Sequence, residues 1–224
     1  MYKRQIYGLQ RSGTNFLEQL VSKNFDVQFV NNNTNRNHPL QKHFRLYDQK
    51  EIIPEPQYKN DLIFTCFNDY LKALGATIPI DAILVISKDP YSWLKSYQQW
   101  SIKCGWSAPN HHYLEEYNLF YRKWVNFAEE DSRIVLIRYL DLLVKPKEIL
   151  KGLQQKNKLR PKFWTKLFGI KTTTSKVPMS NHFLSKNRNY YLNEEYLADF
   201  KATELATINQ LMDLSLLKDL KYKG

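Results

Sequence analysis

A glycine-bounded basic turn near the start of the chain has the residue types of an anion-binding site. Four residues separate Gly8 from Gly13, and the cation Arg11 lies between them. An apolar run precedes the turn, and Thr14 opens a helical pattern after it. Backbone N–H groups at a helix N-terminus attract anions, and glycine lets them approach closely. The turn is therefore predicted to cradle a phosphate or sulfate group.

The turn matches only the first half of the ATP-binding pattern G-x-x-x-x-G-K-[ST]. Thr14 and Asn15 stand where that pattern has its phosphate-binding lysine and its magnesium-binding hydroxyl. The positive charge lies inside the turn, at Arg11, which argues against ordinary magnesium-dependent NTP hydrolysis but preserves anion binding. Because Ser-Gly-Thr is also a common way to begin any helix, the interpretation needs a second match elsewhere.

A second anion-type pattern follows an uninterrupted apolar run at residues 82–87. Such a run predicts a strand buried on both faces of a parallel sheet. Asp89 and Pro90 then predict a helix start, with Asp as the N-cap and Pro at the first helical position. Lys88 at the strand end and Ser96 on the helix are therefore expected to lie along one line that runs from the strand into the helix.

Taken together, the two segments resemble the sulfotransferase family, which binds 3′-phosphoadenosine 5′-phosphosulfate (PAPS). In that family a basic S/G-G-T-T turn holds the 5′-phosphosulfate, and an R-[DN]-P-x(5)-S-x-Y segment holds the 3′-phosphate. The resemblance implies a donor site made of Gln10, Arg11, Ser12, Gly13, Thr14, Asn15, Lys88 and Ser96. A third segment, residues 133–142, looks like the family's strand ending in R-Y-E-D-L.

Two residues depart from the family pattern. Lys88 replaces an arginine, so a point charge takes the place of a planar fork that grips phosphate with two hydrogen bonds. Asn15 replaces a threonine, so an amide donor takes the place of a hydroxyl. Neither change removes the positive charge of the predicted site.

Sulfuryl transfer needs a base near the acceptor hydroxyl and cations near the leaving oxygen. Arg11 fits the cationic role, and the scheme requires no metal. The resemblance implies a base in the segment after the second strand, which contains His38 and His43. We predict His43, because Lys42 and Arg45 keep a nearby imidazole neutral and hold an anionic donor. His38 is the alternative.

Other candidate residues have less distinctive surroundings. His111 and His112 precede a helix, and they either line the acceptor pocket or cap this helix. Lys186 and Arg188 resemble the place where the family closes a lid over the nucleotide, although the glycine-rich lid signature is missing. The aromatic residues with helical spacing are predicted to pack in the core. They are Trp100, Trp106, Tyr113, Tyr117, Tyr121 and Trp124.

The positive charge is concentrated in one part of the chain. Between Lys145 and Arg188 there are twelve basic residues and one acidic residue, Glu148, so this segment carries the whole net charge of +11. Phe163, Trp164 and other aromatic side chains are interleaved with the lysines. Nucleic acid, an anionic membrane face, an anionic glycan and the nucleotide itself all remain possible partners for such a segment.

The 224 residues, 43% of them hydrophobic, are enough for one sizeable core, and we expect a single domain over 1–224. The chain enters a strand within its first residues, and no apolar run approaches the roughly 18 residues that span a bilayer. We therefore expect a soluble, cytoplasmic protein. Cys66 and Cys104 are far apart and are expected to be reduced thiols.

The expected elements alternate between strands and helices. Strands are predicted at 4–9, 26–30, 62–66, 82–87 and 133–138, and helices at 13–24, 68–75, 90–104, 112–130, 146–155 and within 194–220, with loops at 31–47 and 156–192. This order predicts an α/β fold with a central parallel sheet between two helical layers, of the P-loop NTPase-like sulfotransferase type. Both anion motifs would then lie at the carboxyl ends of strands, where ligands collect in such folds.

The leading hypothesis is a PAPS-dependent sulfotransferase that acts on a hydroxyl or amine acceptor, with a saccharide or glycolipid as one such acceptor. A small-molecule kinase would need a loop lysine and a magnesium ligand that the motifs do not supply. A basic nucleic-acid-binding module would agree with a pI near 9.4 but would leave both anion motifs unexplained.

Overall fold

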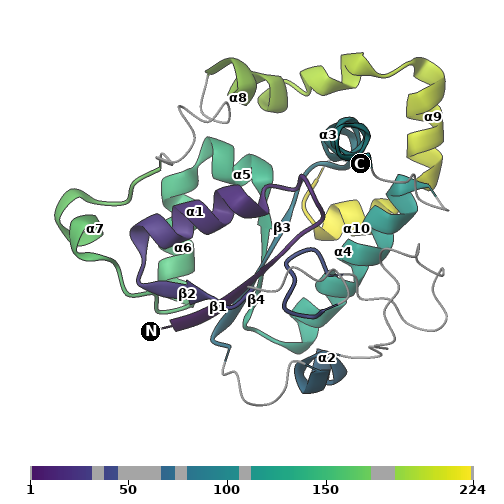
Figure 1. Cartoon of the computed structure of the whole chain (residues 1–224). Helices are drawn as coiled ribbons and strands as arrows, with labels where there is room; N and C mark the ends of the chain where they lie inside the picture. Colours follow the sequence, from purple (N-terminus) through teal and green to yellow (C-terminus); the bar gives the residue numbers. More distant parts are fainter. Residues whose placement is uncertain are drawn as a thin grey trace.

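The structure is a computed structural model that describes residues 2–31, 38–44, 67–73, 80–105, 112–172 and 185–222. Strands and helices alternate along its first two thirds, and helices make up the rest (Figure 1). The elements are β1 (Tyr2–Tyr7), α1 (Thr14–Asn24), β2 (Val27–Phe29), α2 (Phe67–Ala73), β3 (Ala82–Ser87), α3 (Pro90–Cys104), α4 (Tyr113–Glu130), β4 (Ile134–Arg138), α5 (Tyr139–Val144), α6 (Pro146–Lys156), α7 (Phe163–Phe168), α8 (Ser185–Leu192), η3 (Glu195–Asp199), α9 (Ala202–Leu211) and α10 (Leu214–Asp219).

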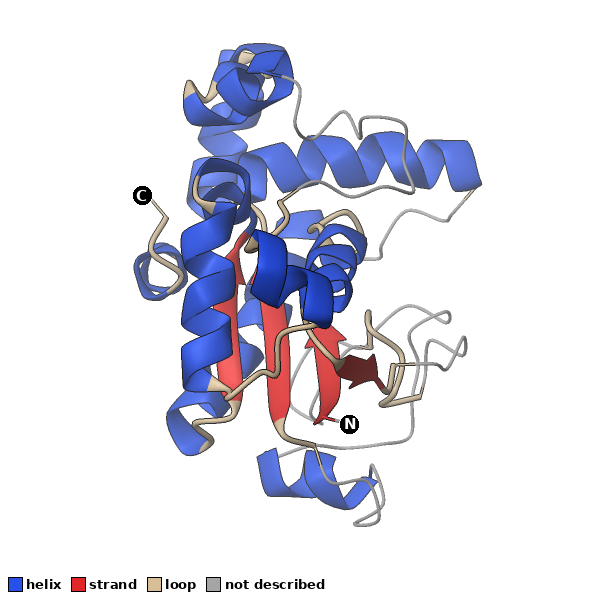
Figure 2. Cartoon of the chain, turned by 90° about the vertical axis from the view of Figure 1, so that its left-hand side faces the viewer, coloured by secondary structure: helices blue, strands red, loops and turns tan. Residues whose placement is uncertain are grey.

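Within the described residues, the strands form one parallel sheet in the order β2-β1-β3-β4 (Figure 2). The central strand β3 is buried along its whole length, as its uninterrupted Ala-Ile-Leu-Val-Ile-Ser sequence predicts. Register places Tyr7 of β1 beside Val85 of β3, and Ser87 beside Arg138 of β4. All three of these strands therefore end at the same edge of the sheet.

Two hydrophobic cores lie on opposite faces of the sheet. Because side chains alternate along a strand, Ile6 and Leu84 face α1, α5 and α6, whereas Tyr7 and Val85 face α3, α4 and α10. Figure 1 shows α1 and α6 on one side of the strands and α4 and α10 on the other. The arrangement is the predicted α/β architecture, with helices on both faces of a parallel sheet.

Most predicted elements agree with the structure to within a few residues, and β3 and α3 agree at both ends. The prediction of one long loop over 156–192 was wrong, because α7 and α8 are helical. The short helix α5 was not predicted, since it follows β4 directly without a polar turn to mark its start. The predicted strand 62–66 lies outside the described residues.

In the described part of the chain, no helix is both long enough and apolar enough to cross a bilayer. Cys104, at the end of α3, is an exposed free thiol, and Cys66 lies outside the described residues.

Candidate functional site

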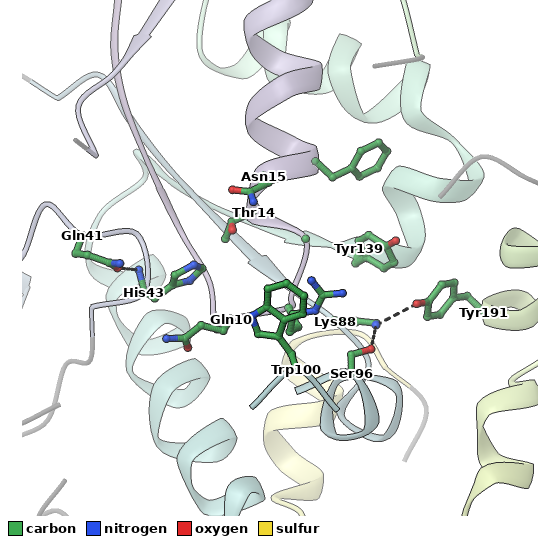
Figure 3. A pocket seen from close by; sticks show the side chains of 13 residues that line it. Gln10, Thr14, Asn15, Gln41, His43, Lys88, Ser96, Trp100, Tyr139 and Tyr191 are labelled. Carbon is green, nitrogen blue, oxygen red and sulfur yellow. Dashed lines mark hydrogen bonds between the residues drawn. The ribbon is translucent and has the colours of Figure 1, made fainter. Parts of the chain in front are cut away.

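A cavity of about 390 Å³ lies where β1, β3 and β4 end (Figure 3). The turn after β1, the end of β3, the middle of α3 and the start of α5 each contribute side chains to it. It is lined by Gln10, Arg11, Gly13, Thr14, Asn15, Phe16, Gln41, His43, Lys88, Ser96, Trp100, Tyr139 and Tyr191. Both anion motifs of the sequence therefore open into one cavity, as their places at the strand ends predicted.

The turn between β1 and α1 is shaped by two residues in the left-handed region. Arg11 has φ 69° and Gly13 has φ 103°. A Cβ on Gly13 would lie 2.6 Å from the Tyr139 ring, so both backbone conformation and space require glycine there. Among the described side chains, none caps the N-terminus of α1. The positive end of the helix dipole thus points into the cavity, where it favours an anion.

Gly8 holds the predicted base against the turn. Its N–H donates to the carbonyl oxygen of Lys42 at 3.2 Å, and its own carbonyl lies 2.6 Å from Nδ1 of His43. Because a carbonyl only accepts, Nδ1 of His43 carries a proton, and the neutral ring then has its lone pair on Nε2. Gly8 also allows close packing, since a Cβ there would lie 2.6 Å from the carbonyl oxygen of Ile86.

Arg11 is exposed at the cavity mouth and stacks on an aromatic ring. Its guanidinium carbon lies 4.6 Å from the centre of the Trp100 ring, a cation–π contact. Trp100 is 39% exposed and lies one helical turn beyond Ser96 on α3. The contact orients the arginine over the cavity without neutralising its charge.

Lys88 lies buried at the end of β3. Its Nζ donates to Oγ of Ser96 at 2.7 Å and to the hydroxyl of Tyr191 at 3.1 Å (Figure 3). The same nitrogen lies 4.8 Å and 5.6 Å from the ring centres of Tyr191 and Tyr139. The prediction that Lys88 and Ser96 act as a pair is thus matched by a direct hydrogen bond.

The surroundings of Lys88 disfavour its charged form. Burial, which removes water from the ammonium group, is the larger cause, and the positive charge of Arg11 adds to it, while Asp89 opposes both. Together they lower the pKa of Lys88 from 10.5 to about 7. A group in this state gains charge readily when an anion enters.

Helix α3 is fixed at its start by its own sequence. Asp89 accepts a hydrogen bond from the backbone N–H of Ser92 at 3.1 Å, and Pro90 occupies the first helical position, as predicted. Trp93, the residue after Ser92, donates from Nε1 to the carbonyl oxygen of Gln10 at 2.9 Å. This bond ties the helix that carries Ser96 to the turn that carries Arg11.

The structure brings most of the predicted site residues together. Gln10, Arg11, Gly13, Thr14, Asn15, His43, Lys88 and Ser96 all line the cavity. Ser12 does not. Its side chain is buried, and its Oγ has no hydrogen-bond partner among the described residues. Lys186 lies in α8, and its predicted contact with the nucleotide stays a prediction.

Several alternatives take other roles in the structure. Nδ1 of His38 accepts from the backbone N–H of Leu40 at 3.1 Å, which braces the turn. His112 caps α4, the second of its two predicted roles, and His111 lies outside the described residues. Arg188 extends toward the carbonyl oxygen of Val144 at 3.5 Å and does not line the cavity, and its predicted place in a lid stays a prediction.

The aromatic prediction was correct for Tyr117, Tyr121 and Trp124, which are buried in the core. It was wrong for Trp100, because the outer face of α3 directs this side chain to the cavity mouth. The sequence contained a signal for it, since Trp100 is four residues from Ser96 and so shares its helical face.

Sequence reasoning also missed Tyr139 and Tyr191. Tyr139 belongs to the Arg-Tyr-Leu-Asp-Leu segment that was recognised, but no role followed from that segment alone. Tyr191 is 103 residues from Lys88 and reaches it only because α8 packs beside α5. No local sequence pattern predicts such a contact.

Comparison with family models finds no family that matches this chain, and comparison with curated proteins finds no significant match. The function must therefore be inferred from the cavity itself.

Proposed function

We propose that the protein is a PAPS-dependent sulfotransferase whose donor site is the cavity at the strand ends. The observation that carries the proposal is the convergence of three features in one cavity. They are the uncapped start of α1 with Arg11, the buried Lys88 bonded to Ser96, and the ring of His43. Two separate anion sites and a base are what transfer from a nucleotide with 3′ and 5′ anions requires.

The residues present fit such a donor. The cavity of about 390 Å³ falls in the range of small-molecule sites. Backbone N–H groups at the start of α1 and the Arg11 guanidinium suit the 5′ end, and Lys88 with Ser96 suits the 3′-phosphate. When bound, PAPS supplies an activated sulfuryl group on a phosphate leaving group.

His43 is the residue that we assign to the proton of the acceptor. With Nδ1 held by the Gly8 carbonyl, Nε2 accepts the proton of an incoming hydroxyl or amine. Arg11 and the helix dipole stabilise the negative charge that develops on the leaving oxygen. The acceptor class that we would test first is a saccharide or glycolipid hydroxyl.

The cavity is less suited to a kinase. Among the thirteen lining residues that the structure describes there is neither Asp nor Glu, the side chains that usually hold Mg²⁺ beside a nucleotide. Across all described residues, no cluster of three or more His, Cys, Asp or Glu side chains has the arrangement of a metal site.

The proposal is tested by calorimetric titration with adenosine 3′,5′-bisphosphate in the presence of EDTA, compared with adenosine 5′-monophosphate. We expect the bisphosphate to bind more tightly, and the advantage to disappear in Lys88→Met while monophosphate binding persists. Lys95→Met, on α3 but outside the residues that line the cavity, is the matched control and should keep the advantage. No binding of the bisphosphate would refute the proposal. Binding of ATP only with Mg²⁺ would favour the kinase, and salt-sensitive retention of RNA or DNA alone would favour the nucleic-acid module.

A further inference from the structure

Helix α7 exposes an unusual amount of apolar surface. Four of its six side chains are large and hydrophobic, and each is more than half exposed. These are Phe163 at 64%, Trp164 at 59%, Leu167 at 58% and Phe168 at 69%. Only Thr165 of this helix is buried. A cluster of this size on one short helix differs from the scattered exposed hydrophobic residues of ordinary surfaces.

The cluster is held outward by a rigid base. Asn24, buried at the end of α1, accepts at its backbone carbonyl from the N–H of Lys162 at 2.9 Å. Its side-chain amide also exchanges two hydrogen bonds with the backbone of Lys171, both at 2.7 Å. Asn24 thus binds the chain both before and after α7. The helix projects at the side of the molecule beyond α1 and α6 (Figure 1). The exposure of its apolar side chains is therefore a built feature of the fold.

The segment that carries the apolar cluster is also rich in positive charge. The stretch from residue 149 to 172 contains seven basic residues and no acidic one. All seven are exposed, namely Lys151, Lys156, Lys158, Arg160, Lys162, Lys166 and Lys171. The acidic residue Asp26 contacts this segment through its backbone. It is partly buried, and its backbone N–H donates to the carbonyl oxygen of Arg160.

We infer that α7 docks the protein on an anionic lipid bilayer. Aromatic and leucine side chains insert at the boundary between headgroups and acyl chains, and the exposed lysines of the same segment meet the anionic headgroups. This inference is independent of the donor site, which lies at the opposite end of α1.

The features of α7 favour a bilayer over other anionic or apolar partners. Leu167 offers no flat ring on which a nucleic acid base stacks, and Trp164 already stacks face to face on Phe168 at 5.8 Å. A second copy of this face would bring the same excess of cations against itself, which costs free energy.

Flotation with lipid vesicles tests the inference on the full chain. We expect binding to vesicles of equal phosphatidylglycerol and phosphatidylcholine, weaker binding at high salt, and little binding to phosphatidylcholine alone. Trp164→Ser with Phe168→Ser should lower the partition coefficient about tenfold or more, and so should Lys162→Glu with Lys166→Glu.

Matched variants control for folding and for net charge. Ile102→Ser removes an 80% exposed apolar side chain outside α7, and Lys103→Glu with Lys218→Glu makes the same change in net charge elsewhere. Both should bind like the wild type, and all variants should have similar thermal unfolding. Failure to bind the anionic vesicles would overturn the inference, as would equal losses in the control variants. So would an α7-dependent dimer, or RNA binding, in the absence of vesicle binding.

Discussion

The buried Lys88 makes anion binding depend on pH in a way that is unusual for lysine. With a pKa lowered from 10.5 to about 7, its ammonium form is disfavoured in the ligand-free protein by about 5 kcal/mol relative to water. A 3′-phosphate placed beside Nζ restores the charge, so binding should take up a proton. The experiment raises the pH and measures the dissociation constant for adenosine 3′,5′-bisphosphate.

The expected magnitude follows from the fraction of Lys88 that is protonated before binding. A pKa of about 7 leaves roughly one quarter of it charged at pH 7.5 and about 0.3% at pH 9.5. If only the charged form binds and each phosphate of the ligand stays dianionic over this interval, the dissociation constant should increase by up to roughly 75-fold. At pH 7.5 the complex should also take up about three quarters of a proton.

Calorimetry in two buffers of different ionisation enthalpy measures both quantities together. Lys88→Arg is the matched variant, because a guanidinium stays charged throughout this range. Its dissociation constant should change little between pH 7.5 and 9.5, and its proton uptake should be near zero. A wild-type profile as flat as that of Lys88→Arg would refute the reasoning, since Lys88 would then be charged before the ligand arrives.

Three further predictions test the rest of the site. His43→Ala should lower turnover by about a hundredfold or more while leaving bisphosphate binding within about twofold, whereas His38→Ala should keep turnover; a fully active His43→Ala would remove this residue from the mechanism. Gly8→Ala should lower the thermal unfolding temperature by several degrees and weaken nucleotide binding, because the new Cβ would lie 2.6 Å from the Ile86 carbonyl; calorimetric unfolding identical to the wild type would contradict the packing argument. Arg11→Gln removes a positive charge that lowers the pKa of Lys88, so the rise in dissociation constant should begin at a higher pH; an unchanged midpoint would show that the two cations do not interact.

Local signals in the sequence were enough to predict the elements that position the cavity. Helix α3 shows why: Asp89 and Pro90 define its start, and Gly105, with φ 63°, ends it in the left-handed region. The buried strand β3 was equally clear because its side chains are apolar on both faces. Both anion motifs could then be placed at one edge of the sheet by topology alone.

Contacts between distant segments could not be predicted in this way. Tyr191 reaches Lys88 through the packing of α8 beside α5, which depends on the tertiary fold of the whole chain. The hydrogen bond that fixes the tautomer of His43 comes from a backbone carbonyl, which every residue carries and no sequence pattern marks. The lowered pKa of Lys88 likewise arises from burial, although its charge was evident from the sequence.

Helix α1 connects the two ends of this molecule. Its first residue borders the cavity, and its last residue, Asn24, clamps the segment that carries α7. Eleven helical residues span about 16 Å, and a hydrogen-bonded helix changes little in length. The helix therefore acts as a fixed spacer. A protein that rests on lipid through α7 would hold the cavity at a fixed distance from that contact. Acceptor groups on extended, flexible headgroups would meet it more easily than groups buried among the phosphates.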